Sequence, residues 1–149
     1  MDYKTITNNE EETIALGRKL GEKVSPNMVI TLHGDLGAGK TTFTKGIGQG
    51  LGVQAIINSP TFTLLKQYSG RFMLHHFDAY RLEGQDDDLG FEDIFEDGGI
   101  CVIEWAQFIE YILPKERLEI TITKRKNQRE MIFHPIGEEY EILVKELYQ

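Results

Sequence analysis

"TLHGDLGAGKTTFTKG", residues 31–46, decides the fold because an apolar run leads directly into closely spaced glycines and a lysine. The fixed positions of the pattern G-x-x-x-x-G-K-[ST] are all filled, by Gly34, Gly39, Lys40 and Thr41. An apolar, strand-forming stretch precedes the pattern, and a helix-forming stretch follows it. The sequence therefore predicts a β-strand, a glycine-rich loop and an α-helix, in that order.

A loop of this composition has a physical use, because glycines let the backbone curl until several N–H groups point to one spot. At the start of a helix, such a nest of N–H groups binds phosphate. Lys40 is expected to reach the β- and γ-phosphates of a nucleotide, and the Thr41 hydroxyl to ligate Mg²⁺. A purely structural glycine turn is the alternative. The predicted nucleotide-binding residues are Asp35, Leu36, Gly37, Ala38, Gly39, Lys40, Thr41 and Thr42.

Length and composition predict one globular domain over residues 1–149, with 40% hydrophobic and 27% charged residues. No apolar run is long enough to span a membrane, and the polar start does not have the pattern of a signal peptide. The one cysteine, Cys101, fits a reducing compartment, so we expect a cytoplasmic protein. A net charge of −8 argues against general nucleic-acid binding, but not against binding one nucleotide.

Strand-forming runs alternate with helix-forming runs along the chain. Strands are predicted at 3–7, 28–34, 71–82 and 100–105, an extended segment at 56–68 and a hairpin at 117–136. Helices are predicted at 8–24, from 41 to about 51, at 106–113 and at 138–149. In the first helix, Asn8 or Asn9 would lie near the N-cap, and Ile14, Leu16 and Leu20 would form the apolar face. This order predicts an α/β fold with a central mixed sheet, flanking helices and a C-terminal hairpin and helix.

Two acidic residues come directly after apolar strands. Asp78 ends "RFMLHHFD" and Glu104 ends "ICVIE". A carboxylate at the end of a strand beside a phosphate-binding loop can hold Mg²⁺ or orient a water molecule. Both acids are therefore candidate catalytic residues together with Lys40, and Glu104 is a candidate metal ligand together with Thr41. Either acid can also be an ordinary surface residue at a strand end.

Three further residues are candidates for a nucleotide switch or a partner contact. Thr61 and Thr63, in "NSPTFTLL", lie between the loop helix and the acidic strand, where a hydroxyl can sense the γ-phosphate. They can also be simple β-formers. Trp105 follows Glu104 directly and either covers the site or belongs to the core.

Several other features have less specific interpretations. His75 and His76 are neighbours on a strand, so their side chains face opposite sides and cannot share a metal ion. Arg81 either contacts phosphate or pairs with nearby acids, and pairing is the favoured interpretation. The acidic stretch 83–99 is either a solvated loop with a short helix or a docking surface for a partner. A basic group is expected at the hairpin tip, as a solvated surface or as a docking or RNA contact: Lys124, Arg125, Lys126 and Arg129.

Five stretches together resemble a known family. "GDLGAGKTTFTKG", "NSPTFTLL", "HFDAYRL", "DLGFEDIF" and "IEWA" occur in the order found in the TsaE (YjeE) family, the small ATPase of bacterial tRNA threonylcarbamoyladenosine biosynthesis. The resemblance covers about residues 8–115. Members frequently have proline after the E-W pair, where this chain has Ala106.

The resemblance implies a three-layer P-loop NTPase fold, with ATP as the substrate and one magnesium ion. It places the magnesium-site acid at Glu104, the H-x-D acid at Asp78 and the family's tryptophan at Trp105, with the switch-like threonine in "SPTFT". Its phosphate-loop roles are carried by Gly37, Gly39, Lys40 and Thr41, with Thr42 next along the helix.

The resemblance also implies partners. TsaE proteins work with the transferase TsaD and its paralogue TsaB in the N6-threonylcarbamoyladenosine modification of ANN-decoding tRNAs, and so meet tRNA indirectly. The sequence has no convincing arginine finger or lid, which predicts a weak Mg²⁺-dependent ATPase that its partners stimulate. Two other classes share the loop: a small-molecule or nucleotide kinase, and a nucleotide-sensing adaptor that does not hydrolyse ATP.

Overall fold

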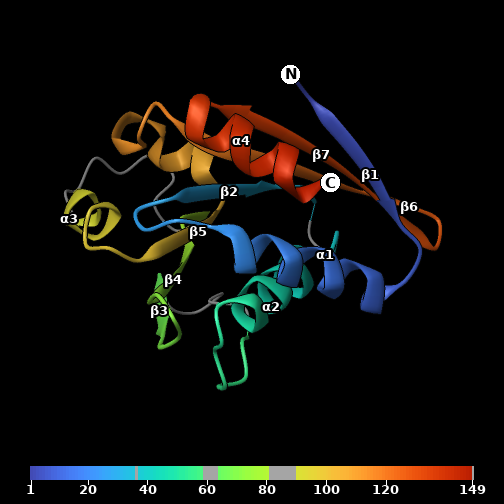
Figure 1. Ribbon diagram of the computed structural model, residues 1–149, viewed down its shortest axis with the longest axis horizontal. Coiled ribbons are helices and arrows are strands. Elements are labelled where there is room, and N and C mark those ends of the chain that lie inside the picture. Colours follow the sequence, from blue (N-terminus) through green and yellow to red (C-terminus); the bar gives the residue numbers. More distant parts are fainter. Residues whose placement is uncertain (36, 59–63, 81–89, 149) are drawn as a thin grey trace.

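The computed structural model describes residues 1–35, 37–58, 64–80 and 90–148, and shows a seven-stranded sheet in the order β1-β7-β6-β2-β5-β4-β3 (Figure 1). The strands are β1 (Tyr3–Thr7), β2 (Val29–His33), β3 (Leu65–Tyr68), β4 (Leu74–Asp78), β5 (Ile100–Glu104), β6 (Arg117–Arg125) and β7 (Gln128–Ile136). The helices are α1 (Glu10–Lys23), α2 (Lys40–Gly50), α3 (Phe91–Phe95) and α4 (Glu138–Leu147), with a 3₁₀ segment, η2 (Ala106–Ile112).

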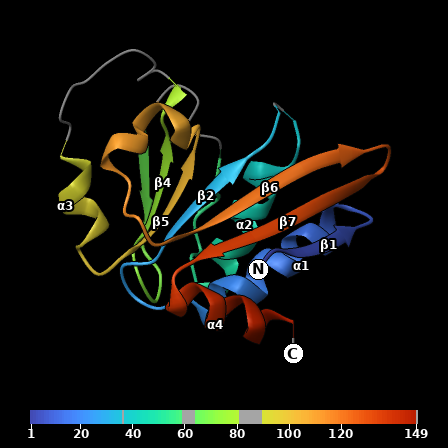
Figure 2. The same cartoon turned by 90° about the horizontal axis from the view of Figure 1, so that it is seen from above.

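The sheet is mixed, as the sequence predicts. Strands β6, β2, β5 and β4 run parallel, and β3, β7 and β1 pair antiparallel at its two sides. The hairpin β6–β7 extends beyond the parallel strands (Figure 2). Because parallel strands end at the same edge, the loop after β2 meets the ends of β5 and β4 there. The register places Glu104 opposite both Leu32 and Asp78.

Helices cover both faces of the sheet, which gives the predicted three layers. The larger core cluster joins the sheet to α1, α2 and α4 through side chains such as Leu20, Phe43 and Leu143. The smaller cluster joins the other face to α3 and η2, with Phe77 packed between helix residues such as Phe91. The central strands are buried on both faces, and this explains their continuous apolar sequences. No helix among the described residues is long and apolar enough to cross a membrane.

The first helix follows the prediction in part, because Leu20 is buried in the core and Leu16 packs against it. Ile14 and Leu16 are only partly buried, whereas Gly17 and Gly21 are buried against α2. A Cβ on Gly17 would lie 2.5 Å from the Phe43 carbonyl oxygen, so the two backbones approach as closely as glycine allows. The apolar pattern missed this face because the contact is made by backbone atoms. The predicted cap is correct: Asn9 accepts a hydrogen bond from the Glu12 N–H at 2.8 Å.

This close contact predicts the effect of substituting Gly46 of α2. A Cβ there would lie 2.2 Å from the Ile14 carbonyl oxygen, so Gly46→Ala should cost about 1–3 kcal/mol of stability through overpacking, despite the helix preference of alanine. Gly48→Ala is the matched control, because its Cβ would meet only the tip of the Ile57 side chain. Urea unfolding measures both, and a Gly46→Ala protein as stable as the wild type would contradict the packing argument.

Two predicted elements differ in detail. The segment 106–113 forms η2 rather than an α-helix, and its backbone leaves helical geometry at Ile109. In the predicted strand 71–82, regular structure begins only at Leu74. The C-terminal hairpin and helix form as expected. Leu36, Ser59–Thr63 and 81–89 lie outside the described residues, which leaves the predictions for Leu36, Thr61, Thr63 and Arg81 untested.

Candidate functional site

The glycine-rich loop brings open N–H groups to the start of α2. Gly37 and Gly39 have φ values of 81° and 112°, which only glycine adopts without strain. The first helical hydrogen bond runs from the Phe43 N–H to the Gly39 carbonyl at 2.9 Å, so the three preceding N–H groups lie in the uncapped first turn. Among the described residues no side chain caps this end, and its first turn has no acid, whereas α1 and α4 both begin with glutamates.

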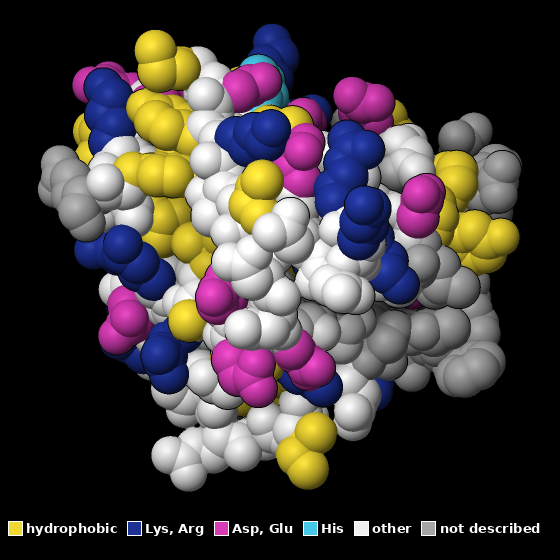
Figure 3. Space-filling view, turned by 90° about the vertical axis from the view of Figure 1, so that its right-hand side faces the viewer, with side chains coloured by type: hydrophobic (Ala, Val, Ile, Leu, Met, Phe, Trp, Pro, Cys, Tyr) yellow, Lys and Arg dark blue, Asp and Glu magenta, His cyan; other side chains and the backbone are white. Residues whose placement is uncertain are grey.

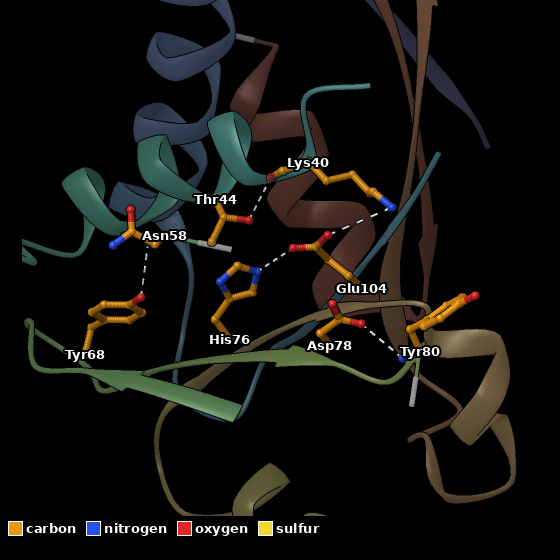
Figure 4. A network of polar contacts seen from close by, with 8 residues as sticks. All are labelled: Lys40, Thr44, Asn58, Tyr68, His76, Asp78, Tyr80 and Glu104. Carbon is orange, nitrogen blue, oxygen red and sulfur yellow. Dashed lines mark hydrogen bonds and ion pairs between the residues drawn. The ribbon is translucent and has the colours of Figure 1, made fainter. Parts of the chain in front are cut away.

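Lys40 lies inside the site rather than in solvent. Its side chain is buried, and Nζ is 3.9 Å from Glu104 Oε1 (Figure 4). Nζ also lies 4.6 Å from the centre of the Trp105 ring. The Thr44 hydroxyl donates to the Lys40 carbonyl at 2.9 Å and ties the start of α2 to its next turn. The ammonium group therefore has an acidic and an aromatic neighbour, and the loop places it beside the ends of the parallel strands.

Glu104 is the most buried acid of this site. Its side chain is held from two directions, by Lys40 at Oε1 and by His76 Nε2 at Oε2, 2.7 Å away (Figure 4). Sequence reasoning set His76 aside because it cannot share a metal ion with His75. The signal that could have found His76 was strand alternation. His76 is two residues before Asp78 on the same strand, so the two side chains point to the same face of the sheet.

Asp78 lies at the end of β4, next to Glu104 at the end of β5. Its Oδ1 accepts a hydrogen bond from the Tyr80 N–H at 3.0 Å. Partial burial raises the pKa of Asp78 and the nearby Glu104 carboxylate adds to this, although the hydrogen bond from the Tyr80 N–H, and then Lys40 and His76, act in the opposite direction. The structure thus brings together the three predicted catalytic residues.

Aromatic rings lie beside these charged groups. Trp105 has a left-handed backbone conformation (φ 60°), an uncommon one for a residue other than glycine. Its ring stacks on Phe108 at a centroid distance of 6.0 Å and meets Tyr80 edge-on at 5.1 Å. Tyr80 and Tyr111 are exposed. Trp105 is partly buried against the smaller core cluster and also contacts Lys40. It thus both covers the site and belongs to the edge of the core, the two roles that the sequence left open.

A pocket adjoins the other side of the loop. It has a volume of about 130 Å³ and lies between the start of α1, the loop and the hairpin, lined by Asn9, Glu10, Gly39, Thr42, Asn127 and Arg129. Sequence reasoning grouped Arg129 with the solvated hairpin tip. The turn at Lys126, with φ 58°, instead leads Arg129 back to the loop, where its Nε would be 3.6 Å from a Cβ on Gly39.

The rest of the basic group fits the solvated interpretation. Lys124, Arg125 and Lys126 are exposed, and Arg125 pairs with Glu130 at 3.7 Å. At this end of the molecule, basic and acidic side chains are interspersed (Figure 3).

The site has oxygen donors suited to Mg²⁺ but no protein-only cage. Among the described residues, no three His, Cys, Asp or Glu side chains gather closely enough to hold a metal ion. Magnesium in nucleotide sites needs only one or two protein oxygens, because phosphates and water complete its coordination. Glu104 at the end of β5 and Thr41 in the first turn of α2 are a donor set of this kind.

Comparison with known proteins agrees with the family resemblance. A family profile described as "Threonylcarbamoyl adenosine biosynthesis protein TsaE" matches residues 7–131. The tRNA threonylcarbamoyladenosine biosynthesis protein TsaE of Bacillus subtilis is 48% identical, over 99% of this chain and 93% of that protein. The protein of the same name from Treponema pallidum is 39% identical, over 80% of this chain and 90% of that protein.

The fold has a solved counterpart. The crystal structure of YdiB from Bacillus subtilis matches with a TM-score of 0.88 and 41% sequence identity, covering 99% of this chain and 95% of that one. Sequence and structure therefore agree over nearly the whole chain. The chain belongs to the TsaE family, whose members from Bacillus subtilis and Treponema pallidum are named tRNA threonylcarbamoyladenosine biosynthesis proteins.

Proposed function

We propose that the protein binds ATP with Mg²⁺ at the glycine-rich loop and hydrolyses it, as an accessory step in tRNA threonylcarbamoyladenosine synthesis. The observation that carries this proposal is the meeting of an uncapped helix start, a buried lysine and two strand-end carboxylates. Lys40 and Glu104 are 3.9 Å apart, and the register places Asp78 beside Glu104. Phosphate, metal and water can each find a matching group there.

In this proposal the loop binds the triphosphate. The uncapped N–H groups of residues 40–42 donate to phosphate oxygens, and Lys40 turns from Glu104 and Trp105 towards the terminal phosphates. The Thr41 hydroxyl and the Glu104 carboxylate hold Mg²⁺, which neutralises charge on the phosphates. The rest of the nucleotide extends towards the pocket at Thr42 and Arg129, on the far side of the loop.

Asp78 is the group we assign to the attacking water. It is less buried than Glu104, and it keeps one oxygen free of the Tyr80 hydrogen bond. A general base works best when its pKa is near the operating pH, and burial raises the pKa of Asp78 in that direction. Asp78 would orient the water and take its proton as the γ-phosphate bond breaks, giving ADP and inorganic phosphate.

The proposed partners follow from the family, and the exposed aromatic rings support a contact next to the site. TsaD and TsaB would bind near Tyr80 and Tyr111, with tRNA held by the complex in the cytoplasm. Exposed rings beside charged groups are common at protein interfaces. A partner can also supply an arginine, and such a group accelerates phosphoryl transfer by about 10³–10⁵-fold.

The test is the rate of phosphate release by the purified protein, alone and with TsaD and TsaB. We expect slow release alone and at least a tenfold increase with both partners, within the range available to an added arginine. Equal rates in the two cases would contradict the partner role. A phosphorylated small molecule in place of free phosphate would indicate a kinase, and tRNA modification that survives loss of hydrolysis would indicate an adaptor.

A further inference from the structure

We infer that His76 is a positioning residue: it holds one oxygen of Glu104 so that the other faces Lys40 and the metal position. This inference rests on the proposed function, because it concerns how Glu104 is presented to Mg²⁺. The residues that carry it are His76 on β4, Glu104 on β5 and Lys40 at the start of α2 (Figure 4).

The two carboxylate oxygens of Glu104 have different partners. His76 is fully buried, and its Nε2 lies 2.7 Å from Oε2, whereas Lys40 Nζ faces Oε1 at 3.9 Å. An ionised carboxylate can only accept hydrogen bonds, so the ring must donate from Nε2. The shorter contact fixes Oε2, and the longer one leaves Oε1 free to exchange its partner.

Nucleotide binding would change the surroundings of Glu104, because Lys40 would move. A triphosphate would attract the Lys40 ammonium group, and Glu104 would then lose the contact at Oε1. Among the described residues, His76 is the partner that stays, because a buried ring on a central strand cannot follow the nucleotide. Metal-binding carboxylates are commonly held by hydrogen bonds of this kind, and losing one typically costs about 10–100-fold in metal affinity or activity.

His75, the neighbour of His76 on β4, differs from it in its hydrogen bonds. His75 uses both ring nitrogens, Nδ1 with Gln67 at 3.0 Å and Nε2 with Asp97 at 3.1 Å. His76 uses only Nε2, and its buried Nδ1 has no hydrogen-bond partner among the described residues. Among the described residues, the hydrogen bond of His76 is the one directed at Glu104.

Two substitutions of His76 keep a polar side chain but place its amide nitrogen at different distances from Glu104. The amide nitrogen of glutamine can approach the place of Nε2, whereas that of asparagine lies near Nδ1 and cannot reach Glu104. The experiment measures the affinity of a non-hydrolysable ATP analogue by calorimetry, with Mg²⁺ and with a chelator, for the wild type, His76→Gln and His76→Asn. His75→Asn is the matched control, because it disturbs an adjacent buried histidine on the opposite face.

We expect His76→Asn to bind the analogue normally without metal, and to need about 10–100-fold more Mg²⁺ for the same gain in affinity. His76→Gln should restore most of this gain, and His75→Asn should leave it intact even if unfolding occurs at a lower temperature. Binding of Mn²⁺ to the analogue complex, followed by electron paramagnetic resonance, should show the same order.

Two results would overturn the inference. One is an unchanged Mg²⁺ requirement in a folded His76→Asn protein, and the other is an equal loss in His76→Asn and His76→Gln. A wild-type protein that binds no analogue at all is a different outcome, because it contradicts the proposed function before His76 is tested.

Discussion

Lys40→Ala is expected to weaken ATP binding by about 10–100-fold, because a hydrogen bond to a charged group contributes about 1.5–3 kcal/mol and each 1.4 kcal/mol is a factor of ten. The substitution also leaves the nearly buried Glu104 without the cation at 3.9 Å. Without the lysine charge, the Glu104 carboxylate would repel the phosphates, although in the proposed site it helps to bind them through Mg²⁺. Hydrolysis should therefore fall further than binding does.

Calorimetry with ATP and Mg²⁺ measures this loss, and phosphate release measures hydrolysis. Lys45→Ala is the control, because Lys45 lies on the same helix one turn beyond the loop, and the loss of its charge should change affinity little. Equal affinities for Lys40→Ala and Lys45→Ala would mean that the loop does not hold the triphosphate. In that case the proposed site, and the role of Glu104 with it, would have to be abandoned.

The fold could be predicted because its signals are local. The apolar run of β5 had to be buried on both faces, the alternation of β6 and β7 indicated a hairpin, and the glycine-rich loop marked the turn from β2 into α2. The position of Asp78 and Glu104 at the edge of the sheet that holds the loop also followed, since parallel strands end at the same edge of a sheet. The order of the strands needed the structure itself.

Three other features of the site and the fold could not be predicted, because they depend on contacts that sequence spacing does not encode. His76 bonds to a residue 28 positions away, and Arg129 returns to the loop only because of the turn at Lys126. The packing of α1 on α2 is made by glycine backbone, which leaves no apolar pattern. Hydrophobic periodicity finds faces that bury side chains, and these three contacts are made by polar groups or by the main chain.

The two carboxylates of the site should respond oppositely when each is neutralised. Asp78→Asn should raise the unfolding temperature at pH 7, because burial makes the charged form of Asp78 unfavourable in the folded protein. Glu104→Gln should lower it, because it removes the carboxylate that faces the buried Lys40. Hydrolysis should fall in both, by about 10²–10⁴-fold for Asp78→Asn if Asp78 is the general base.

The pH dependence makes the Asp78 prediction specific. Because the pKa of Asp78 in the folded protein is raised above 3.8, Asp78 ionises at a lower pH in the unfolded chain than in the folded protein. Its contribution to the free energy of unfolding is therefore fully present at low pH and is lost as the pH rises through the folded-state pKa. The gain in Asp78→Asn should therefore vanish below about pH 4, where aspartate is protonated in both states. Thermal unfolding from pH 3.5 to 8 measures this, with Asp93→Asn on the exposed side of α3 as the control. A gain that persists at pH 3.5, or equal shifts in Asp78→Asn and Glu104→Gln, would show that the two carboxylates do not have the separate roles assigned to them.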